Sequence, residues 1–181
     1  MRRGRRRHRR RRNDRPLLAV LVLVAAVLFG LSLSERNGGT TGSADTAGSA
    51  TVVRVVDGDT LVAQVAGSEE RIRLIGIDTP ESVDPDQPPE CYGHEASDRL
   101  TQLLPAGTPI RLERDVEPRD RYDRLLAYVF RAEDNLFVNR DQVARGFAEA
   151  KEYPPNTTRA DDLEAAEASA RTARAGMWGA C

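Results

Sequence analysis

The chain has 181 residues, which is enough for one domain with appended segments. Its formal net charge of −1 hides an asymmetry: residues 1–16 contain ten arginines and one aspartate, a net of +9, which leaves −10 for residues 17–181. These values exclude a general basic surface on the remainder of the chain, so any polyanion site there needs locally placed cations. The two histidines and two cysteines exclude a zinc site, because they lack the required spacing.

Residues 1–33 join the arginine-rich segment 1–16 to an apolar segment, 17–33. The apolar segment would span about 25 Å as a helix, slightly less than a bilayer core of roughly 30 Å. A basic segment before an apolar one is typical of an export signal or N-terminal anchor, with the basic end in the cytoplasm. The alternative is a nucleic-acid-binding tail. We favour an uncleaved anchor over a cleaved signal, because no small-residue cleavage site lies beside the apolar run. Either way, we expect the rest of the chain outside the cytoplasm, on the cell membrane or secreted.

Residues 34–50 are rich in Gly, Ser, Thr and Ala and show no apolar periodicity, so they predict a flexible linker. The composition becomes globular from Thr51. We therefore expect residues 51–181 to form one domain.

The first part of that domain predicts three strands, over residues 51–56, 60–65 and 70–77. Asp57-Gly58-Asp59 turns the chain between the first two, and residues 66–69 form a hairpin loop. In the third strand Ile72 and Leu74 alternate with arginines, which indicates one buried face. Pro80 removes a backbone donor and ends the strand ladder.

The remainder predicts, in order, a loop over 82–89, a helix over 93–104, strands over 109–114 and 125–131, and helices over 138–145 and 159–174. Thr158 and Asp161 make a capping-box pattern at the start of the last helix, and Gly176 is expected to close it. Five short strands, with a helix after the third and further helices later, predict an α+β fold. We expect a five-stranded barrel of the oligonucleotide-binding (OB) type with three helices.

Acidic side chains gather where the third strand ends. Asp78 and Glu81 flank Thr79 and Pro80, and Arg73 lies five residues before Asp78. Carboxylate oxygens suit a hard cation such as calcium or magnesium, and a guanidinium suits a phosphate. We interpret the stretch as a metal-assisted phosphoryl-transfer site. The alternative is a surface turn capped by acids.

Five segments in this order carry a resemblance to a known family. They are Asp57-Gly58-Asp59-Thr60, Arg73 to Glu81, Tyr92-Gly93-His94-Glu95-Ala96-Ser97, Asp120 to Tyr128, and Val138-Asn139. Together they resemble the staphylococcal nuclease (thermonuclease) family over residues 50–178. The resemblance implies an OB barrel with three helices and calcium-dependent hydrolysis of DNA and RNA phosphodiesters that leaves 3′-phosphates.

The resemblance also implies a set of metal and catalytic residues. By position, Asp59 and Asp78 would be the carboxylate ligands of Ca²⁺, and Thr79 would add its backbone carbonyl. Glu81 would position, and deprotonate, the attacking water.

The same resemblance implies contacts to the nucleic acid. Arg73 and Arg124 would grip the phosphate, where two guanidinium groups offer several donors each. Tyr122 would lie near a terminal phosphate, with Arg121 where the family commonly has lysine. Tyr153 would stack on a base.

Two positions depart from the family pattern. Asp123 precedes Arg124 where the family often has glycine, and a carboxylate there would reduce the availability of Arg124 for phosphate. Arg124 can instead be a surface ion pair with Asp120 or Asp123. Lys151 stands where a stacking tyrosine is sometimes found, so base stacking is expected to be weaker or altered.

Cys91 and Cys181 are expected to form a disulfide if the domain is exported, and to be free thiols if it is not. We expect a monomer. The competing hypothesis is a non-catalytic nucleic-acid-binding module on the same barrel, anchored at the membrane. Degenerate barrels of that kind lose their acids and arginines, so the retention of the catalytic set favours an enzyme.

Overall fold

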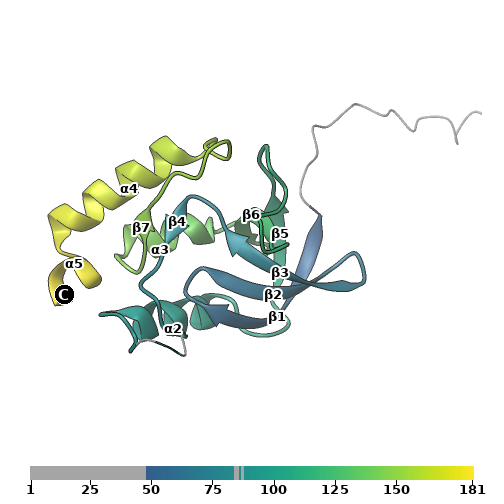
Figure 1. The fold of residues 1–181 in the computed structure, drawn as a ribbon, viewed down its shortest axis with the longest axis horizontal. Coiled ribbons are helices and arrows are strands. Elements are labelled where there is room, and N and C mark those ends of the chain that lie inside the picture. The colour runs from purple at the N-terminus through teal and green to yellow at the C-terminus, as the bar shows by residue number, and fades with distance from the viewer. Residues whose placement is uncertain (1–47, 84–85, 87) are drawn as a thin grey trace, which may run out of the picture. The chain divides into compact units, whose positions relative to one another are not determined.

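A computed structural model describes residues 48–83, 86 and 88–181 of the chain (Figure 1). The predictions for the arginine-rich segment 1–16, the apolar segment 17–33 and the linker up to residue 47 lie outside these residues. In the part of the chain that the structure describes, no helix combines the length and apolar character needed to cross a membrane.

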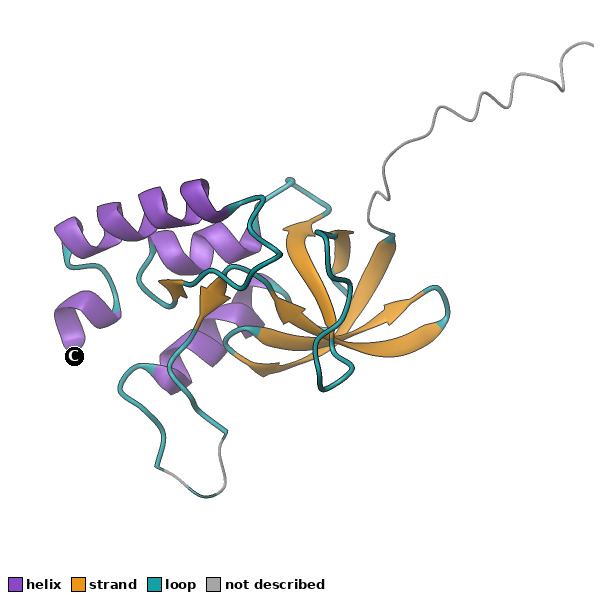
Figure 2. Ribbon diagram, turned by 45° about the horizontal axis from the view of Figure 1, so that its top comes forward, coloured by secondary structure: helices purple, strands orange, loops and turns teal. Residues whose placement is uncertain are grey.

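Five strands close into a barrel in the order β1-β2-β3-β6-β5. They are β1 (Ser49–Asp57), β2 (Thr60–Val65), β3 (Ser68–Leu74), β5 (Pro109–Glu113) and β6 (Leu125–Arg131). Neighbouring strands are antiparallel, except that β3 and β6 are parallel. Figure 2 shows these strands curving around one another at one side of the domain. The predicted five-stranded barrel is thereby confirmed.

Apolar side chains from all five barrel strands share one buried core. Burying each large aliphatic side chain stabilises the fold by about 1.5–3 kcal/mol, which makes this core the main support of the barrel. Its members from the strands include Val52, Leu61, Ala63, Ile72, Leu74, Ile110, Leu112, Leu125, Ala127 and Val129.

The three predicted helices are present in the described residues, with small differences at their ends. They are α2 (Gly93–Leu103), α3 (Val138–Ala144) and α4 (Ala160–Ala173). Helix α2 contacts β1, and α3 contacts both β6 and α4 (Figure 1). The sequence patterns did not predict a one-turn helix, α5 (Met177–Ala180), or a small sheet of β4 (Ile77–Asp78) and β7 (Glu149–Ala150).

The third predicted strand is interrupted. It was expected to run over 70–77, but β3 ends at Leu74 and β4 begins at Ile77. Gly76 lies between them with φ +78°, and a Cβ on this residue would overlap the side chain of Leu163 in α4. The chain therefore turns at Gly76, where both the positive φ and the packing of α4 favour a residue without a side chain. The first strand also starts at Ser49, two residues before the expected start.

The predicted capping box of the last helix is wrong. The residue before α4 is Arg159, and no side chain caps the helix there. The Thr158 hydroxyl instead donates to Asp115 Oδ1 at 2.9 Å, which ties the helix start to the chain after β5. The helix also ends earlier than expected: Arg174 takes the left-handed conformation, and Gly176 precedes α5.

A disulfide joins Cys91 to Cys181, with the two sulfur atoms 2.09 Å apart. Cys91 lies two residues before helix α2, and Cys181 is the last residue of the chain. The bond therefore connects the C-terminal end to the start of α2.

The fully buried side chain of Asn139 links α3 to the barrel. Its Oδ1 accepts a hydrogen bond from the Val129 amide at 2.9 Å, and its Nδ2 donates to the Ile75 carbonyl at 2.8 Å. One amide thus satisfies two buried backbone groups, one in β6 and one in the turn between β3 and β4. This turn leads directly to Asp78.

We predict that Asn139→Ala lowers the free energy of unfolding by about 2–4 kcal/mol, because it leaves a buried N–H and a buried C=O without partners. Urea denaturation followed by circular dichroism measures the change. Gln102→Ala removes an amide side chain from the exposed face of α2 and should change stability by less than about 0.5 kcal/mol. Equal losses in the two variants would contradict this role of Asn139.

Candidate active site

The register of strands β2 and β3 brings Asp59 and Arg73 together. In the β2–β3 pair, Arg73 lies opposite Thr60, the residue after Asp59. The Leu74 amide also donates to the Asp59 carbonyl at 2.9 Å. The turn between β1 and β2 therefore sits beside the end of β3, although the two are separated by more than ten residues in sequence.

Asp59 and Asp78 converge on one nitrogen atom. Arg73 Nη2 lies 3.0 Å from Asp59 Oδ2 and 2.9 Å from Asp78 Oδ1. The same guanidinium donates through Nη1 to the carbonyls of Leu74 and Ile77, at 2.7 and 2.9 Å. The Arg73 side chain is only 11% exposed, so this ion-pair triad is held largely out of solvent.

Thr79 supports the Asp59 carboxylate. Its amide and its hydroxyl donate to Asp59 Oδ2 at 3.3 and 3.2 Å, and Thr60 Oγ1 donates to Asp59 Oδ1 at 2.9 Å. Thr79 is thus beside both acids, as expected for its sequence position. The role of its carbonyl as a metal ligand stays a prediction.

The donor set fits a hard cation. Two carboxylate oxygens meet at one point that a positively charged nitrogen occupies, and oxygen ligands are those that calcium prefers. Within residues 48–83, 86 and 88–181, no group of three or more His, Cys, Asp and Glu side chains is placed to hold a metal ion. A cation between Asp59 and Asp78 would therefore complete its shell with carbonyl or water oxygens.

Glu81 lies on the same cleft, in the loop after β4. Its Oε1 accepts a hydrogen bond from the Val83 amide at 2.7 Å. Its backbone is held on both sides by Glu90: the Glu81 amide donates to Glu90 Oε2 at 3.0 Å, and the Glu90 amide donates to the Glu81 carbonyl at 2.8 Å. The cleft has a volume of about 360 Å³ and is lined by Val56, Asp57, Asp59, Thr60, Arg71, Arg73, Asp78, Thr79, Glu81, Val83, Arg124 and Tyr153.

Asp57, the other acid of the Asp-Gly-Asp turn, is engaged in a separate contact. Its Oδ1 accepts hydrogen bonds from the Gly58 amide at 2.8 Å and from Ser82 Oγ at 2.6 Å. Burial raises the pKa of the Asp57 carboxyl above its usual value. The residue therefore braces the turn against the loop that carries Glu81.

Asp120 organises the loop that presents Arg124. Its Oδ1 accepts from the amides of Tyr122 and Arg124, both at 2.9 Å, and its Oδ2 accepts from Arg124 Nε at 2.6 Å. Neither terminal amino group of Arg124 has a hydrogen-bond partner among the described residues. Arg124 is therefore held by one edge of its guanidinium.

Of the two ion pairs considered for Arg124, the pair with Asp120 forms, and the pair with Asp123 is absent from the described part of the chain. Asp123 has φ +62°, a left-handed conformation that favours glycine and also tolerates aspartate. Its side chain is 89% exposed and faces Arg119, with Arg119 Nη1 3.5 Å from Asp123 Oδ1. This conformation gives a physical reason why glycine suits the position.

The expected substrate residues line a second cleft of about 560 Å³ that shares Arg73, Arg124 and Tyr153 with the first. Arg121 Nη2 donates to the Tyr122 hydroxyl at 2.5 Å, and Tyr122 is 64% exposed. The Tyr122 ring lies under the guanidinium of Arg124 at 5.5 Å, and the Tyr153 ring lies under that of Arg73 at 5.9 Å. The structure thus brings all the residues expected to contact nucleic acid to two adjoining clefts.

Lys151, which stands where the family sometimes has a stacking tyrosine, also lies at this site, but its contact with Asp78 was not predicted. The β4–β7 pair sets Ile77 opposite Ala150, and Lys151 Nζ contacts Asp78 Oδ2 at 2.5 Å. The hydrogen bond to Asp78 raises the pKa of the Lys151 ammonium. The sequence offered two signals for Lys151: its position in the family pattern, and its being the single lysine of the chain, beside 26 arginines.

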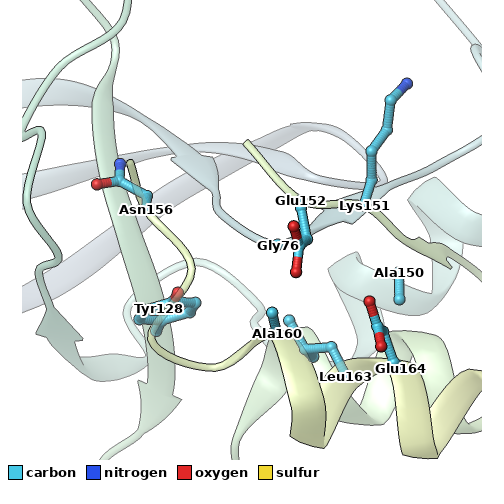
Figure 3. A pocket seen from close by; sticks show the side chains of 9 residues that line it. All are labelled: Gly76, Tyr128, Ala150, Lys151, Glu152, Asn156, Ala160, Leu163 and Glu164. Atoms are coloured by element: carbon cyan, nitrogen blue, oxygen red, sulfur yellow. The ribbon is translucent and has the colours of Figure 1, made fainter. Parts of the chain in front are cut away.

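Lys151 also lines a small pocket that is separate from the two clefts. It has a volume of about 10 Å³, close to the space of one water molecule, and is lined by residues that include Gly76, Tyr128, Ala160 and Leu163. In Figure 3 the Lys151 side chain extends away from these residues. The pocket is too small for a ligand, and the ammonium is not part of it.

We predict a pH-dependent loss of stability for Asp120→Asn. Burial raises the pKa of Asp120, but hydrogen bonds from Arg124 and Tyr122 outweigh it and hold the pKa below the usual 3.8. A lowered pKa means that the carboxylate contributes full stability above pH 3.8 and loses it as the pH falls through the folded-state pKa. The variant should be about 1 kcal/mol less stable at pH 7, with the difference shrinking below pH 3.8.

Urea denaturation at a series of pH values measures this difference. Asp123→Asn is the matched control, because it removes a charge from the same loop at an exposed position. A constant difference for Asp120→Asn down to pH 2, or an equal effect of the control, would contradict the role of Asp120.

Comparisons with known proteins identify the family of the chain. The family model described as "Staphylococcal nuclease homologue" matches residues 71–180. The thermonuclease of Staphylococcus intermedius is 38% identical over 162 residues, 89% of this chain and 92% of that protein. The thermonuclease of Staphylococcus hyicus is 39% identical over 127 residues, covering 70% and 73% of the two chains. Endonuclease YncB of Bacillus subtilis (strain 168) is 35% identical over 130 residues, covering 71% and 60%. The chain therefore belongs to the staphylococcal nuclease homologue family.

Proposed function

We propose that the chain is a calcium-dependent nuclease that hydrolyses phosphodiester bonds of DNA and RNA and leaves 3′-phosphates. The observation that carries the proposal is the convergence of Asp59 and Asp78 on one cationic nitrogen of Arg73, in a cleft that also contains Glu81 and Arg124. The relatives named thermonuclease and endonuclease support this class of reaction.

Asp59 and Asp78 would hold the cation, with Thr79 beside them. When bound, a calcium ion would neutralise part of the charge of the phosphodiester and polarise it as a Lewis acid. Arg73 Nη2 occupies the point between the two carboxylates, so this nitrogen has to shift for a cation to bind there. The Nη1 contacts to two backbone carbonyls would keep the shifted guanidinium at the cleft.

Arg73 and Arg124 would bind the phosphate. A phosphodiester is anionic, and attack at phosphorus places more negative charge on its equatorial oxygens. Guanidinium donors at those oxygens stabilise this charge. Arg124 is suited to the task, because Asp120 fixes its Nε while its two terminal amino groups make no hydrogen bond within the described residues.

Glu81 would accept the proton of the attacking water. The water oxygen forms a bond to phosphorus while the bond from phosphorus to the 5′-oxygen breaks. The leaving oxygen takes up a proton from solvent in the open cleft, which gives a 5′-hydroxyl and a 3′-phosphate. The hydrogen bond from the Val83 amide would hold the carboxylate in position for this proton transfer, and the contacts with Glu90 would hold the Glu81 backbone.

Tyr122, Arg121 and Tyr153 would position the nucleic acid along the second cleft. Base stacking on an exposed aromatic ring contributes roughly 1–3 kcal/mol and depends little on sequence. The net charge of −10 on residues 17–181 opposes long-range attraction of a polyanion. We therefore expect modest affinity that falls steeply as the salt concentration rises.

We also propose that the domain acts outside the cytoplasm as a monomer, either secreted or held at the cell membrane by residues 17–33. The basic and then apolar pattern of residues 1–33 supports this location. The Cys91–Cys181 disulfide supports it as well, because such bonds persist in oxidising compartments.

The proposal predicts that the full-length chain cleaves single-stranded DNA and RNA with calcium and not with a chelator. Glu81→Gln should reduce the rate by roughly 10²- to 10⁴-fold, because the amide cannot accept the proton of the water. Gel electrophoresis of end-labelled oligonucleotides measures the rate and identifies the 3′-phosphate.

Glu133→Gln removes the same charge from an exposed turn outside the cleft and should cleave at the wild-type rate. Binding of oligonucleotides without cleavage under any divalent ion would favour the competing hypothesis of a binding module. Cleavage that survives Glu81→Gln would retain the nuclease but remove Glu81 as the proton acceptor.

A further inference from the structure

Lys151 is the one lysine in a chain that otherwise uses arginine, and it lies at a proposed metal ligand. Its ammonium contacts Asp78 Oδ2 at 2.5 Å, while Arg73 Nη2 contacts Asp78 Oδ1 at 2.9 Å. Both oxygens of Asp78 are therefore occupied by cations. Because Asp59 is paired with the same arginine, the two acids and the two bases balance in charge.

A divalent cation would disturb this balance. Placed between Asp59 and Asp78, it would add two positive charges beside two existing ones, and like charges at contact distance repel even where solvent screens them. Binding is then favourable only if a resident cation moves away from Asp78. The Nη2 atom of Arg73 has to shift from the point between the two acids, but its guanidinium stays at the cleft through the Nη1 contacts. Which cation leaves the site altogether follows from how firmly each one is anchored.

Lys151 is the more easily displaced of the two. Arg73 is 11% exposed and has two further hydrogen bonds, to the carbonyls of Leu74 and Ile77. The Lys151 side chain is 50% exposed, and its ammonium lies 5.6 Å from the centre of the exposed Tyr153 ring. It can leave Asp78 for solvent by rotation of its flexible stem, without losing a buried contact.

We propose that Lys151 is a resident counter-ion of Asp78 that competes with the divalent cation and lowers its affinity. This inference rests on the proposed function, because it takes Asp59 and Asp78 as the cation ligands. In the absence of the cation, Lys151 neutralises Asp78. When the cation binds, the ammonium is released toward Tyr153, at the edge of the cleft where the substrate phosphate would lie.

Isothermal titration of calcium into the full-length chain tests the proposal without any activity assay. Lys151→Gln should bind calcium roughly 3- to 10-fold more tightly than the wild type, because it removes the competing charge and keeps a polar side chain. Lys151→Arg keeps the cation and should bind within about twofold of the wild type.

Arg140→Gln is the matched control. Arg140 forms an ion pair with Asp162, Nε to Oδ1 at 2.8 Å, and its side chain is 48% exposed, close to the value for Lys151. The substitution removes one positive charge of similar exposure from a pair outside the cleft. Its calcium affinity should equal that of the wild type, which separates local competition from a change in net charge.

The outcomes separate this inference from the proposed function. Calcium binding of equal strength in the wild type and Lys151→Gln overturns the inference and leaves the calcium site intact. Weaker binding in Lys151→Gln also overturns it. Absence of calcium binding in both proteins overturns the calcium-dependent function and the inference together.

The unique lysine allows a second measurement on the unsubstituted sequence. Reductive methylation with ¹³C-formaldehyde labels only Lys151 and the N-terminal amine, so one lysine signal appears in the NMR spectrum. Calcium should shift this signal as the ammonium leaves Asp78. A lysine signal that stays unchanged at saturating calcium overturns the proposal.

Discussion

The ion-pair triad of Arg73, Asp59 and Asp78 joins the paired strands β2 and β3 of the barrel to the short strand β4, which lies outside the barrel. Asp59 belongs to the turn after β1, Arg73 to the end of β3, and Asp78 to β4. Two backbone carbonyls complete the set of acceptors around the guanidinium. A buried pair contributes little net stability when both partners are present, but loss of one partner leaves an uncompensated charge. The triad therefore acts chiefly to specify how these segments meet.

The local pattern of apolar and turn-forming residues predicted most of the fold, because this pattern indicates where strands and helices begin and end. Strand β2 has the predicted bounds, residues 60–65. The break between β3 and β4 was missed because its cause is distant: Gly76 takes a positive φ under Leu163, which lies in α4. The capping box failed for a related reason, since Asp115 draws the Thr158 hydroxyl away from the helix.

In the candidate site, too, residues that are close in sequence could be predicted, and contacts that depend on distant parts of the chain could not. Asp78, Glu81 and Arg73 could be predicted because they lie at one strand end, close together in sequence, whereas Asp59 was predicted only from the family resemblance. The sequence left Asp120 and Asp123 as alternative partners of Arg124, and the choice depends on the left-handed conformation of Asp123, which exposes its side chain and leaves Asp120 to make the pair. The contact between Lys151 and Asp78 depends on a sheet of two residues per strand, which is too short to leave a periodic signal.

The charges of the cleft have two opposing effects, one on the stability of the site without a divalent cation and one on the binding of that cation. Without a divalent cation, Asp59 and Asp78 would repel, and Arg73 and Lys151 remove that repulsion. The same two cations then oppose the divalent ion that the acids would hold. Arg73 cannot be dispensed with, because it also contacts two carbonyls and would bind phosphate. Lys151 lacks the two carbonyl contacts that Arg73 makes. A substitution of Lys151 can therefore change the metal affinity without loss of the fold.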